Sequence, residues 1–374
     1  MWHRFLMSAA RRYLKRQVRR RAPQPLNGLD LSRVRRVLLL NFTALGDLLF
    51  STPAIRALKE TYPNWRLDLL VKPQFISLME NNPHIYRLWQ YPGRGMGLLR
   101  LKEELGRENF DLAIILHGND PEASVLARAA SPFIIGSGKS PLSFAYSAAV
   151  AQADPFRHAI EHRLDFVRLV GADTADKRME LFLPTTAQAE ADVLLSRHFG
   201  ASAVRLMALH PTGSGAYKWW PQENFITLGR YLYDRYEAPL LIISGRQDRP
   251  AAEALAARLP GPSLVTGGRH PLATVAALLR RARLLVANDS GPLHLALALQ
   301  VPSIALIGAD HPARIGPYRV DWGACLYRKD EACREERCLN QRCPDNRCMQ
   351  AIEPAEVVRV IETWWEPGFL DSRR

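Results

Sequence analysis

The chain has 374 residues, 47% of them hydrophobic, and a formal net charge of +13 at pH 7. This length and apolar content are enough for the cores of two ordinary domains. No apolar run has the length of a membrane-spanning helix, so the composition excludes a membrane-spanning protein and predicts a soluble enzyme of two domains.

The first predicted element is a basic amphipathic helix within residues 1–32. On a helix, the apolar face contains Trp2, Phe5, Leu6, Ala9 and Tyr13. Eight basic residues precede any acidic one: Arg4, Arg11, Arg12, Lys15, Arg16, Arg19, Arg20 and Arg21. Because anionic headgroups attract such a helix, we expect it to bind a membrane surface. A disordered basic tail is the alternative. No nucleic-acid-binding motif accompanies the charge, so nucleic acid is not an expected partner.

Eight apolar runs predict buried strands, four in each half of the chain: 36–41, 66–71, 111–116, 133–136, 205–209, 240–244, 283–287 and 302–307. Helical patterns alternate with these runs, which predicts an α/β fold with two doubly wound parallel sheets. A polar stretch between Asp154 and Pro184 is the natural boundary. We therefore expect a first domain at 33–180 and a second at 181–352.

A candidate functional residue follows the first strand. Gly46 and Asp47 join the run 36–41 to an amphipathic helical pattern at 48–59. Gly46 permits a tight turn or the close approach of a ligand. Asp47 is placed at the carboxyl end of the strand, where open α/β sheets bind their ligands. The alternative is that Asp47 only caps the helix.

A phosphate-binding turn is predicted in the second half. The run 283–287 leads into a helical pattern through Asn288-Asp289-Ser290-Gly291-Pro292-Leu293-His294. Free backbone N–H groups and the positive end of a helix dipole meet in such a turn, and together they suit a phosphate. Asp289 can meet a sugar hydroxyl there, and His294 can reach back to the same place. An ordinary strand-to-helix connection with a buried histidine is the alternative.

Three segments follow one another in the chain: Gly46 to Lys59, His210 to Ser214 with Lys218 to Pro221, and Asn288 to Ala296. In this order they resemble bacterial ADP-heptose:lipopolysaccharide heptosyltransferases of glycosyltransferase family 9. The resemblance extends from about Val34 to Ile361. It implies GT-B architecture, in which two Rossmann-like domains face each other across a cleft. It also implies that a helix in the C-terminal segment 353–374 returns to the first domain.

The resemblance also implies roles for single residues. Asp47 matches the family's proposed base, and Gly46 lies in the adjoining donor or acceptor loop. Lys218 matches a lysine that contacts the donor phosphates, although an exposed loop lysine is the alternative. The other implied donor-binding residues are Thr212, Ser214, Asp248, Asp289, Ser290, Gly291, Pro292, Leu293 and His294. Pro292 has no N–H group and cannot itself donate to a phosphate.

The reaction implied by this resemblance is transfer of a heptose from ADP-heptose to a hydroxyl of the lipopolysaccharide inner core, with inversion. The implied acceptor is a lipid A-linked oligosaccharide. The enzyme is then cytoplasmic and peripheral on the anionic inner face of the inner membrane. The alternatives are a GT-B transferase that uses another nucleotide sugar on a lipid-linked acceptor, and a nucleotide-sugar isomerase. A non-catalytic protein of the same fold is disfavoured by the presence of both Asp47 and Lys218.

The sequence predicts no cofactor and no metal in the reaction. No G-x-G-x-x-G motif follows the first strand, so a nicotinamide cofactor is not indicated. No two aspartates lie two residues apart, so the paired-aspartate metal motif of many nucleotide-sugar transferases is missing. Five cysteines lie in the segment 325–348: Cys325, Cys333, Cys338, Cys343 and Cys348. Their spacing departs from the usual zinc pairs, which favours reduced structural thiols, with a metal site as the alternative.

Overall fold

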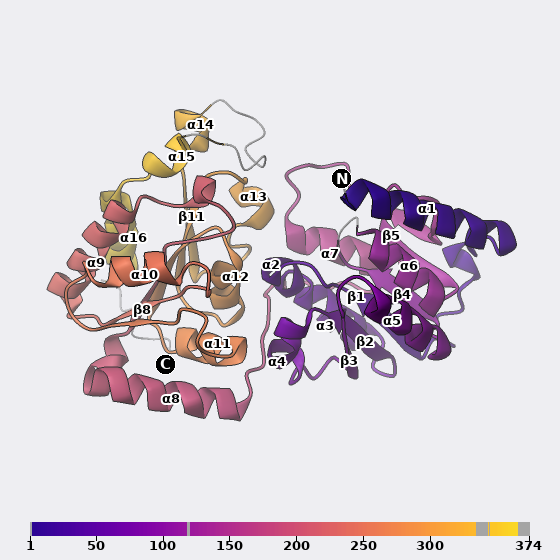
Figure 1. The fold of residues 1–374 in the computed structure, drawn as a ribbon, viewed down its shortest axis with the longest axis horizontal. Coiled ribbons are helices and arrows are strands. Elements are labelled where there is room, and N and C mark those ends of the chain that lie inside the picture. Colours follow the sequence, from indigo (N-terminus) through magenta and orange to yellow (C-terminus); the bar gives the residue numbers. More distant parts are fainter. Residues whose placement is uncertain (1, 118–119, 334–342, 344, 366–374) are drawn as a thin grey trace. The chain divides into compact units, whose positions relative to one another are not determined.

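The chain divides into two compact units, Met1–Lys177 and Arg178–Arg374. The structure is a computed structural model that describes residues 2–117, 120–333, 343 and 345–365 (Figure 1). Each unit contains one six-stranded sheet with helices on both faces, and every pairing between its described strands is parallel. The prediction of an α/β fold with two doubly wound, Rossmann-like domains is confirmed.

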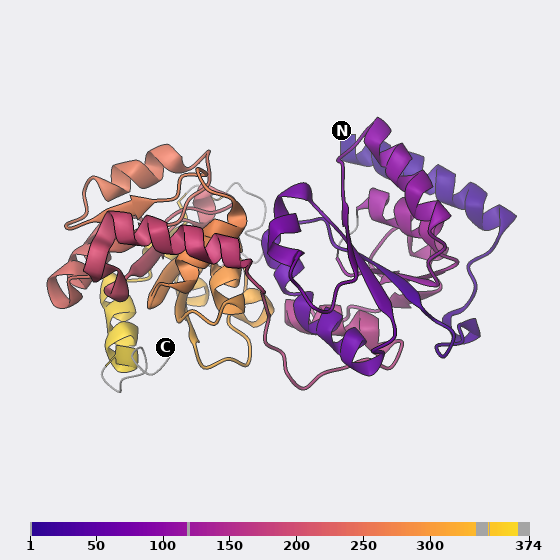
Figure 2. The same ribbon diagram turned by 90° about the horizontal axis from the view of Figure 1, so that it is seen from below.

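The first sheet has the strand order β3-β2-β1-β4-β5-β6, which is the order of a dinucleotide-binding Rossmann fold. Its strands are β1 (Arg36–Leu40), β2 (Arg66–Val71), β3 (Arg87–Gln90), β4 (Leu112–Ile115), β5 (Phe133–Ser137) and β6 (Ala148–Val150). The helices of this unit are α1 (Trp2–Arg20), α2 (Leu45–Leu49), α3 (Thr52–Thr61), α4 (Ile76–Met79), α5 (Met96–Arg107), α6 (Pro121–Ala130) and α7 (Ala159–Arg168). Figure 2 shows α1 and α7 on opposite sides of the sheet.

The second sheet repeats this order within its own unit, as β12-β11-β10-β7-β8-β9. Its strands are β7 (Met207–His210), β8 (Leu240–Ile242), β9 (Ser263–Val265), β10 (Leu284–Asn288), β11 (Ser303–Ile307) and β12 (Gly323–Tyr327). Its helices are α8 (Thr185–Phe199), α9 (Gln222–Tyr236), α10 (Arg249–Ala256), α11 (Leu272–Arg280), α12 (Gly291–Ala298), α13 (Pro312–Ile315), α14 (Lys329–Ala332), α15 (Arg347–Gln350) and α16 (Pro354–Trp365).

The strand order of each sheet fixes where a ligand site forms. In the first sheet β1 pairs with β4, and in the second β7 pairs with β10. The direction of the strand order reverses at each of these two pairs. Loops after the paired strands therefore lie next to each other at the carboxyl edge, which is where open α/β sheets bind ligands.

Helix α1 is confirmed, but a different face of it is apolar and buried. Ala10 and Leu14 belong to the core of the first unit, and Met7, Tyr13 and Val18 pack against that core. Helix α1 packs against α6 through these apolar residues. They recur with helical spacing, as do the residues of the predicted stripe through Ala9 and Tyr13. The side chains of Trp2, Arg4 and Phe5 lie outside the described part of the chain. The basic side chains face solvent: Arg11, Arg12, Lys15, Arg16, Arg19, Arg20 and Arg21.

The C-terminal helix α16 differs from the expected return to the first domain. Val357 and Ile361 are fully buried in the core of the second unit, and α16 packs against α9 and β12. β12 is an edge strand whose residues are only partly buried. The apolar stripe of α16 packs against this strand. The apolar side chains of α16, which we expected to contact the first domain, are therefore buried against the second sheet instead.

Candidate active site

The loop after β1 is organised by a buried asparagine. The Nδ2 group of Asn41 donates to the backbone oxygen of Asp47 (2.9 Å) and to Ser51 Oγ (2.7 Å). Helix α2 starts after Ala44, and no side chain caps it. Asp47 is therefore not the helix cap, and its carboxylate is available for other contacts. Gly46 is buried inside α2 and does not have the positive φ that a tight glycine turn would require.

The carboxylate of Asp47 contacts two side chains from other elements. Arg163 of α7 places Nη2 2.9 Å from Asp47 Oδ1. His117, two residues beyond the end of β4, places Nε2 3.3 Å from the same oxygen. Arg163 is 8% exposed at its side chain, whereas Asp47 is 27% exposed. Asp47 is thus held from inside the domain and still reaches solvent, as a proton-accepting group for a bound substrate must.

Burial sets the charge state of the two partners of Asp47. It lowers the pKa of His117 to about 4, although the carboxylate of Asp47 acts in the opposite direction. At neutral pH the imidazole of His117 is therefore neutral, and its contact with Asp47 is not an ion pair. Burial also lowers the pKa of Arg163, again against the effect of Asp47. Breaking such a pair by removing one partner is costly, because the other charge stays buried.

The second unit brings Lys218, Asp289 and His294 together. Lys218 Nζ forms an ion pair with Asp289 Oδ2, and His294 Nε2 lies 3.8 Å from Asp289 Oδ1. Although burial acts to raise it, the hydrogen bond from His294 and the charge of Lys218 lower the pKa of Asp289. Burial acts to lower the pKa of Lys218, but Asp289 raises it overall. Lys218 is thus a fixed cation and not an exposed loop lysine.

The turn between β10 and α12 has the predicted geometry of a strand, a short turn and a helix. Ser290 is the N-cap residue of α12, and its hydroxyl donates to the backbone oxygen of Asn288 (3.0 Å) and not to the helix. No side chain caps this helix. The N–H groups of Gly291 and Leu293 therefore lie in an uncapped first turn, where the helix dipole favours an anion. Pro292 takes the place between them.

The loop after β7 joins this turn. Thr212 is buried, and its hydroxyl donates to Asp248 Oδ2 (3.3 Å). Asn288 donates from Nδ2 to the backbone oxygen of Thr212 (3.2 Å) and accepts at Oδ1 from the backbone N–H of Trp220 (3.0 Å). Asn288 thereby ties the loop that carries Lys218 to the strand that precedes Asp289. Ser214, by contrast, is exposed.

The sequence predicted Asp47 but not the two side chains that contact it, His117 and Arg163. His117 follows the strand run 111–116, so its place at a carboxyl edge was a usable signal. Arg163 carried no signal, because only the tertiary fold brings α7 to Asp47. In the second unit, Lys218, Asp289 and His294 form one group, and Thr212 and Asp248 form another.

The described cysteines do not form a metal-binding group. No group of three or more His, Cys, Asp or Glu side chains with the arrangement to hold a metal ion occurs among the described residues. Cys325, Cys333, Cys343 and Cys348 form no disulfide with one another, and Cys338 lies outside the described residues. Burial, with a smaller contribution from Asp289, raises the pKa of Cys325 to about 12, so its thiol is neutral.

Sequence comparisons give a consistent set of relatives. A profile described as glycosyltransferase family 9 (heptosyltransferase) matches residues 98–343. Lipopolysaccharide heptosyltransferase 3 of Escherichia coli K12 is 26% identical over 287 residues, which is 71% of this chain and 80% of that protein. Lipopolysaccharide heptosyltransferase 1 of Pseudomonas aeruginosa is 27% identical over 300 residues, covering 76% of this chain and 81% of that protein.

Solved structures share the fold. A glycosyl transferase of family 9 from Veillonella parvula has a TM-score of 0.77 at 22% identity and covers 90% of this chain and 97% of its own. E. coli heptosyltransferase WaaC with ADP has a TM-score of 0.68 at 20% identity, with coverage of 88% and 99%. The iron-containing dodecameric glycosyltransferase TibC from enterotoxigenic E. coli is more distant, with a TM-score of 0.55 at 15% identity and coverage of 89% and 76%.

Proposed function

The chain belongs to glycosyltransferase family 9, and we propose that it moves a heptose from ADP-heptose to a hydroxyl of the lipopolysaccharide inner core. The observation that carries this proposal is the presence of a held carboxylate, Asp47, in one domain and a partly buried cation, Lys218, beside an uncapped helix start in the other. The names of the curated relatives and of the ADP-bound structure point to the same donor and acceptor.

The proposed step is a direct displacement at the anomeric carbon of the heptose. The acceptor oxygen forms a bond to that carbon while the bond to the ADP phosphate oxygen breaks. The bonding electrons leave with ADP, and the acceptor proton goes to the carboxylate of Asp47, which acts as general base. Attack opposite to the leaving group inverts the configuration. Arg163 and His117 are positioning residues, because both contact Asp47 Oδ1.

The leaving diphosphate gains charge as the bond breaks, and fixed positive groups must stabilise it. We assign this role to Lys218 and to the N–H groups of Gly291 and Leu293 at the start of α12. Lys218 keeps Asp289 as its counter-ion when no donor is bound. We assign contacts with the other parts of the donor to Thr212, Asp248 and His294. Ser214, in the same loop as Thr212, is assigned a further contact.

We also propose that no metal ion and no cofactor take part in the transfer. The sequence lacks the paired aspartates that hold a metal in other nucleotide-sugar transferases, and Lys218 can supply positive charge in its place. The iron-containing TibC makes this a point to test. Turnover in the presence of a strong chelator should equal turnover with added magnesium, and loss of activity on chelation would overturn the metal-free mechanism.

A lipid-linked acceptor requires the enzyme to work at a membrane surface. None of the helices in the described ranges has the length and hydropathy of a bilayer-spanning segment. The exposed basic side chains of α1 form a row that suits an anionic surface, with each residue near the surface contributing about 1 kcal/mol. We therefore propose peripheral binding on the inner face of the inner membrane, through charge and not through insertion of the buried α1 stripe.

The test of the proposed function is release of ADP from ADP-heptose with and without a heptose-free lipopolysaccharide core acceptor. A transferase releases ADP at a high rate only when the acceptor is present. Release that is independent of the acceptor, or conversion of the free nucleotide sugar, would favour the isomerase alternative. A thermal-shift comparison of ADP with UDP, GDP and CMP tests the donor base, because only ADP should stabilise the protein strongly.

A further inference from the structure

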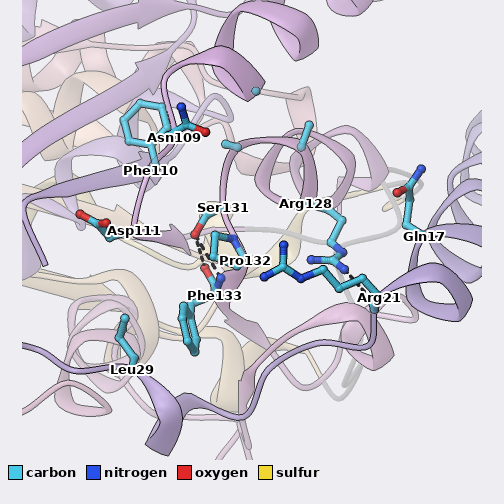
Figure 3. A pocket seen from close by; sticks show the side chains of 13 residues that line it. Gln17, Arg21, Leu29, Asn109, Phe110, Asp111, Arg128, Ser131, Pro132 and Phe133 are labelled. Atoms are coloured by element: carbon cyan, nitrogen blue, oxygen red, sulfur yellow. Dashed lines mark hydrogen bonds between the residues drawn. The ribbon is translucent and has the colours of Figure 1, made fainter. Parts of the chain in front are cut away.

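A pocket of 540 Å³ lies at the edge of the first sheet opposite to Asp47 (Figure 3). It forms where α1, α5 and α6 end and where β4 and β5 begin. Its polar lining comes from Gln17, Arg21, Asn109, Asp111, Arg128 and Ser131. Because Asp47 follows the carboxyl end of a parallel strand, this pocket at the amino ends of β4 and β5 is separate from the proposed base.

Two guanidinium groups stand next to each other in this pocket. Arg128 Nη2 donates to the backbone oxygen of Arg21 (2.6 Å), which joins the last turn of α6 to the end of α1. Figure 3 shows both guanidinium groups in the same part of the pocket. Burial lowers the pKa of Arg128, and the charge of Arg21 acts in the same direction. The arrangement keeps two positive charges close together, which is unfavourable without an anion.

Capping of α1 does not account for this pair. Arg128 Nε is buried and has no hydrogen-bond partner among the described residues. Asp111 is the acidic residue of the lining, and its Oδ2 atom already accepts from the backbone N–H groups of Arg35 (2.8 Å) and Arg36 (2.9 Å). In Figure 3 Asp111 lies away from the two arginines. The lining therefore holds one donor without a partner in the described part of the chain, and positive charge that Asp111 does not balance.

We propose that this pocket binds the phosphate of a membrane lipid headgroup. A phosphate matches the guanidinium fork in shape and charge, and Gln17 at the rim adds an amide. We infer that the phosphate belongs to a lipid, because the row of basic residues that faces solvent along α1 ends at Arg21, where the pocket begins. The inference rests on the proposed function, because a lipid-linked acceptor is what brings the chain to a membrane.

The test compares Arg21→Gln with Arg20→Gln in the full chain. Both residues are exposed and adjacent, and each change removes one positive charge, but only Arg21 lines the pocket. The probe is a vesicle of phosphatidylcholine and phosphatidylglycerol, and the readout is the dissociation constant from co-sedimentation. Arg20→Gln should weaken binding about fivefold, as for one charge near an anionic surface. Arg21→Gln should weaken it more than about tenfold, as for a lost charge-assisted hydrogen bond.

Arg128→Gln is the second variant, because it removes the other guanidinium group of the pocket but keeps a polar side chain. It should match Arg21→Gln in vesicle binding and keep a melting temperature close to that of the wild type. Equal losses in Arg20→Gln and Arg21→Gln would overturn the proposal in favour of diffuse surface charge. If the protein binds inorganic phosphate but does not bind vesicles, the proposal that the phosphate belongs to a lipid is overturned.

Heptose transfer to a soluble, delipidated acceptor separates this inference from the proposed function. Arg21→Gln should leave that activity unchanged, since Arg21 is far from the carboxyl edge that holds Asp47. If the wild-type chain shows no transfer at all, the proposed function is wrong. The order of the vesicle affinities of the variants then still tests whether the pocket binds a lipid phosphate. If transfer occurs and the vesicle ranking is absent, only the pocket proposal is overturned.

Discussion

Arg163 Nη2 lies 2.9 Å from Asp47 Oδ1, and this pair joins the buried face of α7 to the loop after β1. Arg163 is almost fully buried, so its charge depends on the carboxylate. The contact fixes the direction of the Asp47 side chain before any substrate arrives. A group that accepts a proton in a transition state benefits from being held in this way.

Replacement of Asp47 by Asn tests the base. Asparagine keeps an oxygen for Arg163 but cannot accept the proton of the acceptor hydroxyl. We expect Asp47→Asn to lower kcat by about 10² or more, because general-base catalysis contributes about 10²–10⁴-fold. The affinity for ADP, measured by calorimetry, should stay nearly the same. Turnover close to that of the wild type would remove Asp47 from the reaction.

The depressed pKa of His117 predicts a pH dependence of stability. The pKa is 6.5 for an ordinary histidine and about 4 in the folded chain. Between these values the unfolded chain binds more protons, so the free energy of unfolding falls as pH falls from about 6.5 to about 4. The effect of His117 is absent above this window.

Denaturant unfolding of the wild type and of His117→Gln measures this effect. The variant should lose less stability on acidification, by roughly 1–3 kcal/mol at the lower end of the window. His162 and His210 also have lowered pKa values, but both remain in the variant, and their contributions cancel in the comparison. Identical pH profiles for the two proteins would contradict a neutral, buried His117.

Lys218→Ala tests the donor site of the second domain. It should weaken ADP binding and should lower kcat further, by about 10²-fold, because charge on the diphosphate grows toward the transition state. Lys218→Arg is the matched control, since it keeps a cation beside Asp289. Added magnesium should not rescue the alanine variant. A change in melting temperature alone, with kcat and ADP affinity preserved, would limit Lys218 to a structural role.

The docked position of α1 predicts a stability effect. Leu14 is fully buried in the core of the first unit, so Leu14→Ala should lower the free energy of unfolding by about 2–5 kcal/mol. Lys15→Ala, at an exposed neighbouring position, should change it by less than about 0.5 kcal/mol. Equal stability of both variants in urea unfolding would show that α1 is not part of the domain.

The sequence predicted the interior of both sheets and missed their edges. All eight apolar runs became strands, but β3, β6, β9 and β12 were not predicted, and these four are the edge strands. An inner strand such as Leu112–Ile115 is buried at every residue, whereas β3 and β12 are only partly buried. Edge strands have a neighbour on one side only. β3 begins and ends with a polar residue, and β6 and β9 have only three residues each, so these strands lack the long apolar run that identifies a buried strand.

The same limit applies to the candidate site. Asp47, Asp289 and the start of α12 could be predicted because each lies in, or just after, the short connection that follows an apolar run. Lys218 needed the family resemblance, since a loop lysine has no pattern of its own. Arg163 could not be found from local sequence, because α7 reaches Asp47 only through the packing of the domain.

The most direct measurement is the mass of a heptose-free lipopolysaccharide core acceptor after incubation with this protein and ADP-heptose. We expect the acceptor to gain the mass of one heptose residue and an equal amount of ADP to appear. Asp47→Asn should abolish most of this gain, while Arg20→Gln should leave it intact when the acceptor is soluble and delipidated. An acceptor of unchanged mass in the presence of folded, ADP-binding wild-type protein would contradict the proposed transferase activity.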